Sequence, residues 1–414
     1  MAADMDSDAV RSRLEALCPI LDQIQDNTRS ASISTGVLHH GEVVLTRSRG
    51  FRDAESQAPV DSETNYPICS LTKAFTAACC GILVDEGKLE WAKPLQSYIP
   101  FRSTADPVIG ERATMQDALS HNTGLAHMDL TWLGLECDYI LDKEDLLGVV
   151  NHLPPVHDLR SGFHYNNYMY AVAGLVIEQQ PGRPWYEFLK ERILEPLAMH
   201  RTVTNRAKLP DDNVAEPHVV LDDYSLHRQK AVDTAADNTL MGPAGPDWSA
   251  QAIAQTMFGL QPPIDFAEVS KQRAKVEYER YADLAADFEY FQNKERGEEK
   301  HFNVNLEDYV GKYVNTGLKM ALDIRHSSDK SLIMVVNNVP SQHHRLTHFA
   351  GDKLGFLPSS REEFVIREFI DWFKWDQFVL CFHRHEEWGM INGVAWALQN
   401  GIKPVYFKRI SLEE

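Results

Sequence analysis

The chain has 414 residues, of which 43% are hydrophobic and 24% charged, a balance that is ordinary for a globular protein of two or three domains. Its net charge of −19 argues against a nucleic acid or an anionic membrane as partner. That charge favours a small-molecule or peptide ligand instead. No apolar run approaches the roughly 20 residues that a membrane-spanning helix needs.

The first eight residues, Met1 to Asp8, are acidic and lack a basic region followed by an apolar run, which argues against a secretory signal. The six cysteines show no metal-ligand spacing. Several of them lie in apolar surroundings, as small core residues do in a reducing compartment. We therefore expect a cytoplasmic protein.

The first predicted elements are a helix and a hairpin. Apolar residues recur at helical spacing over residues 9–28, which indicates an amphipathic helix. Alternating residues then predict a strand over Ser32–Leu38, a turn at His40-Gly41 and a returning strand over Val43–Thr46.

The stretch from Pro67 predicts a helix that carries a nucleophile near its start. From Leu71 the apolar residues follow one helical face, so Ser70 lies in the first turn with Lys73 on the same side. A serine hydroxyl needs a neighbouring base to take its proton, and a lysine serves where burial keeps its amine neutral. Ser-x-x-Lys is the nucleophile motif of penicillin-binding proteins and serine β-lactamases.

A second Ser-x-x-Lys, Ser327 to Lys330, lies in a polar stretch that predicts a turn. Either pair alone is a weak signal. We favour Ser70 because it opens a long helix with an apolar face, whereas Ser327 does not.

A histidine, His121, follows a short helix predicted over Ala113–Leu119. It has two interpretations, as a general base or as a residue that orients a loop. We favour the loop because Lys73 is the better-placed base. Further helices are predicted over residues 143–152, 170–178, 185–193 and 246–260.

Several blocks together resemble the serine β-lactamase and penicillin-binding-protein-like family, in its branch of class C-like esterases, D-aminopeptidases and transesterases. Their order and spacing match over about residues 10–245. The blocks are Gly50–Asp53, Ile68–Phe75, Asp85–Leu89, Leu119–Leu125 and Phe163–Asn167.

The resemblance implies roles for two residues of the last block. Tyr165 would share a proton with Lys73, as base in acylation and as acid toward the leaving group. Asn167 would hydrogen-bond the substrate amide or Lys73. The alternative for Tyr165 is an aromatic that packs at a helix start, and Tyr-x-Asn recurs at Tyr313–Asn315, so only the context is informative.

The family has a third motif, a Lys-Thr-Gly or His-x-Gly triplet on a strand that lines the cleft. The chain contains no Lys-Thr-Gly, and no His-x-Gly follows the Tyr-x-Asn block. Compared with the family that the chain resembles, about a hundred residues are missing between a segment at Asn238–Gly245 and the helix predicted from Pro246. Their loss would leave an open sheet edge. Lost exons, a degenerate relative and a different segment in the gap are the three explanations.

The C-terminal half begins with a charged helix from Asp265 to about Lys300, whose recurring apolar residues predict that it packs between domains. Short alternating segments then predict an antiparallel barrel or sandwich, which resembles the lipocalin-like domain of some family members. His383 and His385 alternate on one strand face, and we favour a solvated strand end over a metal site. The predicted strands are Ala321–Arg325, Ser331–Val336, Arg345–Phe349, Glu363–Phe369, Gln377–Phe382, Gly389–Val394 and Val405–Ile410.

We therefore predict an α+β fold. Residues 1–260 form a β-lactamase/transpeptidase-like domain, an antiparallel sheet with helices that is incomplete, residues 261–302 a helical connector and residues 303–414 an antiparallel β-barrel. The predicted function is a serine hydrolase or acyltransferase that forms an acyl-enzyme on Ser70. Lys73 and Tyr165 are its other catalytic residues, Asn167 binds the substrate, and it needs no metal or organic cofactor.

The resemblance implies a small-molecule or peptide-like acyl substrate, such as a natural product of fungal secondary metabolism. The resemblance does not fix the oligomeric state, and a homo-oligomer is compatible with it. The alternative function is a catalytically impaired binding or scaffold protein that lacks the strand of the third motif.

Overall fold

The computed structural model describes residues 6–179, 182–229, 245–298, 305–369 and 374–410. The chain divides into two compact units. The first unit comprises Met1–Cys69, Val203–Asp283 and Pro358–Asp371, and the second comprises Ser70–Thr202, Leu284–Leu357 and Trp372–Glu414. The domain boundaries expected near residues 260 and 302 stay a prediction.

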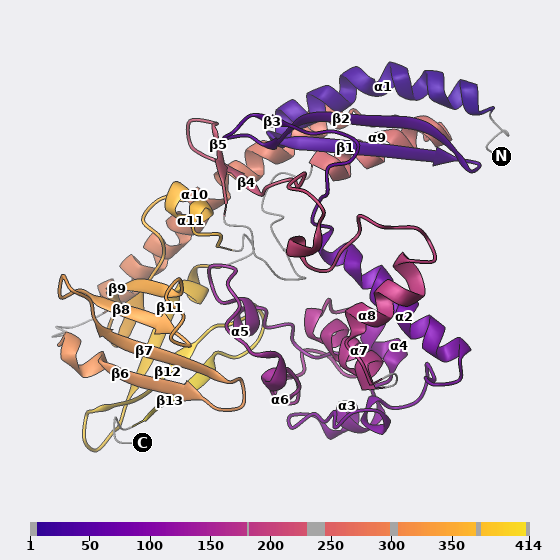
Figure 1. The fold of residues 1–414 in the computed structure, drawn as a ribbon. Coiled ribbons are helices and arrows are strands. Elements are labelled where there is room, and N and C mark those ends of the chain that lie inside the picture. The colour runs from indigo at the N-terminus through magenta and orange to yellow at the C-terminus, as the bar shows by residue number, and fades with distance from the viewer. Residues whose placement is uncertain (1–5, 180–181, 230–244, 299–304, 370–373, 411–414) are drawn as a thin grey trace. The chain divides into compact units, whose positions relative to one another are not determined.

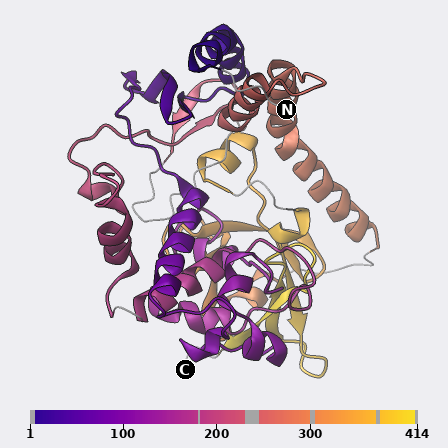
Figure 2. The same cartoon turned by 90° about the vertical axis from the view of Figure 1, so that its right-hand side faces the viewer.

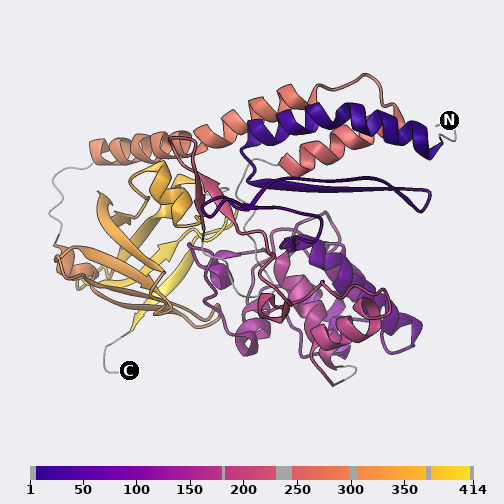
Figure 3. The ribbon, with the colours of Figure 1, turned by 45° about the horizontal axis from the view of Figure 1, so that its top comes forward.

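In the first unit, two helices cover one face of a long hairpin (Figure 3). The helices are α1 (Ser7–Thr28) and α9 (Gly245–Phe258), and the antiparallel strands are β1 (Ser32–His39) and β2 (Glu42–Asp53). The predicted helix and hairpin are thus confirmed. The core between them consists of Val10, Leu14, Leu21, Ile24, Val37, Val44, Ala252, Ile253 and Phe266.

The sheet of the first unit is small. Its third strand, β3 (Ala58–Pro59), pairs with β2, and within the described ranges no other strand pairs with β1. A separate ribbon consists of β4 (His218–Val220) and β5 (Leu226–Arg228). The open edge at β1 agrees with the predicted loss of sheet neighbours. The segment before the expected gap, Asn238–Ala244, lies outside the described residues.

The second unit contains a group of helices in which α2 (Thr72–Asp85) packs against α7 (Asn167–Gln179) and α8 (Trp185–Leu189) (Figure 1). The expected face of α2 is buried at Cys79 and Leu83. Leu71, also expected there, precedes α2 and is exposed. The shorter helices are α3 (Pro107–Arg112), α4 (Met115–Leu119), α5 (Leu130–Leu133) and α6 (Leu146–Val150).

The second unit also contains a closed antiparallel barrel of eight strands, in the order β10-β11-β12-β13-β6-β7-β8-β9. The predicted C-terminal barrel is therefore confirmed. Its strands are β6 (Gly311–Asn315), β7 (Met320–His326), β8 (Leu332–Val336), β9 (His343–Ala350), β10 (Lys353–Gly355), β11 (Val379–Arg384), β12 (Ile391–Trp396) and β13 (Val405–Ile410).

The charged helix α10 (Phe266–Glu298) is a single long helix, as Figure 2 shows. Near its C-terminal end, Phe291 stacks on Trp375 with ring centroids 4.2 Å apart, and Phe288 meets Phe349 at 5.0 Å. These apolar contacts explain why a helix with so many charges folds onto the barrel wall.

One predicted strand is wrong. The segment over Glu363–Phe369 begins as a helix, α11 (Arg361–Ile366). The Ser360 side chain caps this helix by accepting a hydrogen bond from the backbone N–H of Glu363 at 3.1 Å. Glu363 also pairs with Arg367 one helical turn later, at 3.0 Å. These local bonds outweigh the alternating apolar pattern, which had indicated a strand.

Candidate active site

Ser70 lies in a short turn at the entrance of α2. The turn is a 3-10 helix over Cys69–Leu71, and α2 follows at Thr72. The Ser70 side chain is exposed, and Lys73 follows on the first turn of α2. The free N–H groups at the start of this helix favour negative charge that develops near Ser70.

The structure brings the four predicted site residues into one hydrogen-bonded cluster within the second unit. The Oγ of Ser70 lies 2.7 Å from the hydroxyl of Tyr165. The Nζ of Lys73 donates to the Oγ of Ser70 at 3.0 Å and to the Oδ1 of Asn167 at 2.7 Å. The same Nζ lies 4.8 Å from the centroid of the Tyr165 ring. A hydroxyl, an amine and a phenol therefore share one continuous path for a proton.

His121 supports the loop that carries Tyr165. Its Nδ1 accepts the backbone N–H of Asn166 at 3.0 Å, and its ring lies 4.5 Å from the ring of Tyr165. Burial, together with the positive charges of Lys73 and His164, lowers the pKa of the His121 imidazole. A neutral ring with its Nδ1 occupied by a backbone N–H has the geometry of a residue that orients the loop.

Asn166 was not singled out from the sequence, although it lies between two residues that were. Its side chain is fully buried and donates to the carbonyls of Leu125 and Ala126 at 3.0 and 2.9 Å. Its Oδ1 accepts the N–H of Met169. Asn166 thus ties the segment after His121 to the start of α7, which fixes where Tyr165 and Asn167 leave the backbone.

Asp117 anchors the same region from α4. It completes a capping box with Thr114 and accepts two hydrogen bonds from the guanidinium of Arg160, at 2.7 and 2.8 Å. Burial alone raises the pKa of the Asp117 carboxyl, but the hydrogen bonds from Arg160 and Thr114 outweigh burial and hold that pKa below its usual range.

We expect Asp117→Asn to lower the free energy of unfolding at pH 7 by about 1–3 kcal/mol, because it removes charge-assisted hydrogen bonds from a buried site. Since the folded-state pKa is lowered, this stability is present above the unfolded-state pKa near ~4 and is lost as pH falls below it. Urea titrations at pH 7 and pH 3 measure the difference, which should shrink at pH 3. Glu144→Gln, a change at an exposed acid, serves as control, and equal curves for Asp117→Asn and wild type at pH 7 would contradict the expectation.

The second Ser-x-x-Lys has a different environment. Ser327 lies in the turn between β7 and β8, where its hydroxyl donates to the carboxylate of Asp329 and lies 3.0 Å from the Oγ of Ser331. These contacts give the Ser327 hydroxyl a structural role within the turn. The chain's His-x-Gly triplet, His39-His40-Gly41, also forms a turn, the one that joins β1 to β2, where His40 and Gly41 have φ angles of 48° and 84°.

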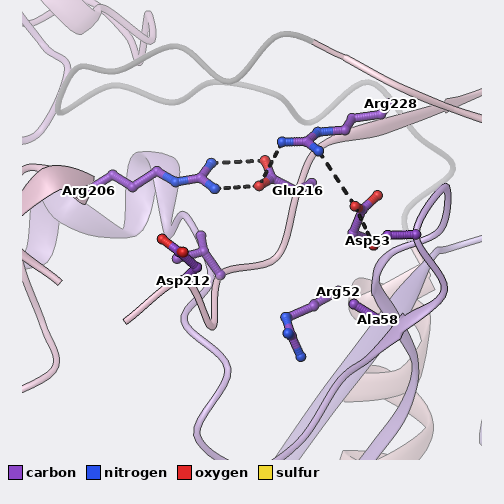
Figure 4. A pocket seen from close by; sticks show the side chains of 9 residues that line it. Arg52, Asp53, Ala58, Arg206, Asp212, Glu216 and Arg228 are labelled. Carbon is purple, nitrogen blue, oxygen red and sulfur yellow. Dashed lines mark hydrogen bonds and ion pairs between the residues drawn. The ribbon is translucent and has the colours of Figure 1, made fainter. Parts of the chain in front are cut away.

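A pocket of about 330 Å³ lies in the first unit and contains none of the predicted site residues (Figure 4). Its charges largely compensate one another, because Glu216 pairs with both Arg206 and Arg228, and Arg228 also reaches Asp53 at 3.5 Å. The hydrogen bonds from Arg206 lower the pKa of Glu216. The lining residues are Arg52, Asp53, Ser56, Ala58, Arg206, Asp212, Val214, Glu216 and Arg228.

The described ranges contain neither a membrane-spanning helix nor a cluster of three metal-ligating side chains. None of the helices there is both long and apolar enough to cross a membrane. No group of three or more His, Cys, Asp or Glu side chains in the described part of the chain has an arrangement that could hold a metal ion. His385, which with His383 was the alternative metal site, stacks on Trp388 with ring centroids 4.7 Å apart.

The chain belongs to the Beta-lactamase family, because the model of that family matches residues 19–273. This range contains all four residues of the cluster and confirms the predicted α+β, β-lactamase/transpeptidase-like fold for this part of the chain. The match ends before the barrel begins at Gly311.

Three of the curated relatives that the chain resembles carry the names of enzymes. A D-aminopeptidase of Cereibacter sphaeroides is 26% identical over 209 residues, 49% of this chain and 38% of that protein. An unguisins hydrolase, ungD, of Aspergillus violaceofuscus is 29% identical over 170 residues, 39% of this chain and 29% of that protein. Esterase EstB of Burkholderia gladioli is 25% identical over 209 residues, 48% of this chain and 52% of the esterase. The matches thus span about a third to a half of each relative's length.

Proposed function

We propose that this protein is a serine hydrolase or acyltransferase that acts on an ester, thioester or amide through an acyl-enzyme on Ser70. The observation that carries the proposal is the pair of hydrogen bonds at Ser70, 2.7 Å to the hydroxyl of Tyr165 and 3.0 Å to the amine of Lys73. Both distances lie within the reach that a base needs to take the proton of a nucleophile.

The proposed reaction has two steps. In the first, the Oγ of Ser70 bonds to the acyl carbon while its proton passes to the pair formed by Lys73 and Tyr165. The bond from the acyl carbon to the leaving oxygen, sulfur or nitrogen breaks, and this pair returns the proton to the leaving group. In the second, water, an alcohol or an amine bonds to the acyl carbon and the bond from that carbon to the Oγ of Ser70 breaks. The proton of the attacking group passes through Lys73 and Tyr165 to this Oγ, which regenerates Ser70.

The substrate that we propose is a small molecule or a peptide-like compound. The support is the range of the relatives, whose names describe an aminopeptidase, an esterase and an unguisins hydrolase. The similarity to the Aspergillus hydrolase supports a role in fungal secondary metabolism. The net charge of −19 supports a neutral or cationic substrate over a polyanion such as a nucleic acid.

A second candidate is a catalytically impaired binding or scaffold protein. The missing third motif favours it, because in the family the strand of that motif supplies the second backbone donor to the oxyanion. Loss of one such donor typically costs about 10²- to 10³-fold in rate. Within the described ranges, β1 has a strand neighbour on one side only, which is what the loss of that strand would leave.

The two candidates differ in whether Ser70 reacts. We expect a fluorophosphonate to label the purified protein on Ser70, which intact-mass and peptide mass spectrometry will detect. Ser327, in the same digest, is the internal control and should stay unlabelled, because its neighbours do not activate it. A well-folded protein without an adduct would support the binding protein.

Replacing Tyr165 by phenylalanine should lower the rate of labelling and of ester turnover by about 10²- to 10³-fold, because the variant lacks the hydroxyl that lies against Ser70. The phenyl ring keeps the contact with His121, so the fold should survive. Tyr98→Phe is the matched control, since the Tyr98 hydroxyl accepts the backbone N–H of Glu90, which is not part of the cluster. A rate within a few-fold of wild type for Tyr165→Phe would exclude Tyr165 from the proton path.

A further inference from the structure

A buried carboxylate, Asp129, accepts hydrogen bonds from Asn167 of the proposed active site. Its side chain is only 7% exposed and precedes α5. Both of its oxygens accept the Nδ2 of Asn167, at 3.2 and 3.3 Å, and one of them also accepts the indole N–H of Trp132 at 2.9 Å. The Nδ1 of His127 lies 3.4 Å from the other.

This contact decides which end of the Asn167 amide faces Lys73. An ionised carboxylate only accepts hydrogen bonds, so it orders the amide with its NH₂ group toward Asp129. The oxygen of the amide then points the other way, where it accepts the Nζ of Lys73 at 2.7 Å. A reversed amide would set two donors, the NH₂ group and the ammonium, against each other. The hydrogen bonds that link Asp129 to Asn167 and Asn167 to Lys73 therefore favour one orientation of the Asn167 amide.

The barrel holds the segment that carries Asp129. The backbone N–H of Met128 donates to the Oε1 of Gln399 at 2.9 Å, and the N–H of Leu135 donates to the Oε1 of Gln342 at 2.8 Å. Both glutamines are buried, at 5% and 0% exposed, and both come from loops between barrel strands. The segment is thus fixed before and after Asp129 by two side chains that are more than 200 residues away in the sequence.

We propose that Asp129 is a positioning residue that orients Asn167 and through it Lys73, and that the C-terminal barrel keeps Asp129 in place through Gln399 and Gln342. This inference rests on the proposed function. It assigns the barrel a part in the reaction, because without its two buried acceptors the segment from Met128 to Leu135 would have unpaired backbone N–H groups. In this proposal Asp129 acts through Asn167 and not on Ser70 directly.

The test uses the rate constant for fluorophosphonate labelling of Ser70, measured from pH 5 to pH 9. Asp129→Asn keeps the shape of the side chain, but it can donate as well as accept and so no longer fixes the amide. We expect labelling to slow by about 10- to 100-fold at the pH optimum, as small displacements of a reacting group do. Asp142→Asn, the same change at an exposed position of this unit, is the control.

The pH profile separates positioning from a general structural role. Lys73 faces Tyr165, Tyr170, His121 and, through Asn167, the negative charge of Asp129. Asp129→Asn removes that charge from the surroundings of the proton path, so the inflection of the rate against pH should move in this variant. An unchanged rate or an unmoved inflection, with wild-type labelled on Ser70, would overturn the role of Asp129. Wild-type protein without any label would instead overturn the proposed function.

A second pair of variants tests the barrel. Gln399→Leu removes the acceptor of the Met128 N–H and should slow labelling, whereas Gln399→Glu keeps an acceptor oxygen and should restore the rate. Circular dichroism and urea titration check that both variants fold. If Gln399→Glu labels as slowly as a folded Gln399→Leu, or if Gln399→Leu labels like wild type, the barrel does not hold Asp129 in the way proposed.

Discussion

Replacing Ser70 by alanine is expected to lower the turnover of a simple ester such as 4-nitrophenyl acetate by about 10⁴- to 10⁶-fold, to the level of the background reaction. The expectation follows from the proposed acyl-enzyme, for which the Oγ of Ser70 is the bond-forming atom. Lys73 and Tyr165 remain in Ser70→Ala, but they have no hydroxyl between them to activate. Initial rates on purified protein, corrected for spontaneous hydrolysis, measure the effect.

Ser327→Ala is the matched control for this variant, because Ser327 opens the chain's other Ser-x-x-Lys. Its hydroxyl donates to Asp329 in a turn of the barrel, so its loss should leave turnover unchanged. Thermal unfolding shows whether each variant is folded. Turnover that persists in folded Ser70→Ala would mean that another group carries the acyl transfer.

Replacing Lys73 by methionine should cost about 10²- to 10⁴-fold in the same assay, the range over which a general base contributes. Methionine keeps most of the length of the side chain but cannot take a proton or donate to Ser70 and Asn167, as the Nζ of Lys73 does. The rate of Ser70 labelling should fall in parallel, because both reactions depend on the activated hydroxyl.

Lys88→Met is the control for a lost lysine. Lys88 lies just beyond the end of the same helix, where its Nζ pairs with Glu86 at 2.8 Å on an exposed surface, and such pairs contribute little. Its loss should leave both rates unchanged. If Lys73→Met labels at the wild-type rate while Lys88→Met behaves as expected, the base that activates Ser70 lies elsewhere.

Local spacing made half of the site predictable. Ser70 and Lys73 are three residues apart, so the geometry of one helical turn brings them together whatever the rest of the chain does. Tyr165 is 95 residues from Ser70, and its contact depends on how α7 packs against α2. The residues suggested its place only through the resemblance of whole blocks to a family.

The supporting groups could not be predicted for the same reason. Asp129 lies in a segment whose composition is ordinary, and its importance comes from the amide of Asn167, 38 residues later. The two glutamines that hold this segment come from barrel loops more than 200 residues away. A buried acceptor that satisfies a distant backbone N–H leaves no periodic pattern in a sequence.

The sequence by itself determined the amphipathic helix α1, the hairpin β1–β2, the helix α2 that follows Ser70 and most strands of the barrel, because each depends on interactions between near neighbours. It failed at α11, where a cap and an ion pair outweighed an alternating pattern. Only the tertiary structure decided that the barrel closes, that Tyr165 approaches Ser70 and that Asp129 approaches Asn167. These features depend on contacts between distant segments, whose energy is gained only when the chain has folded.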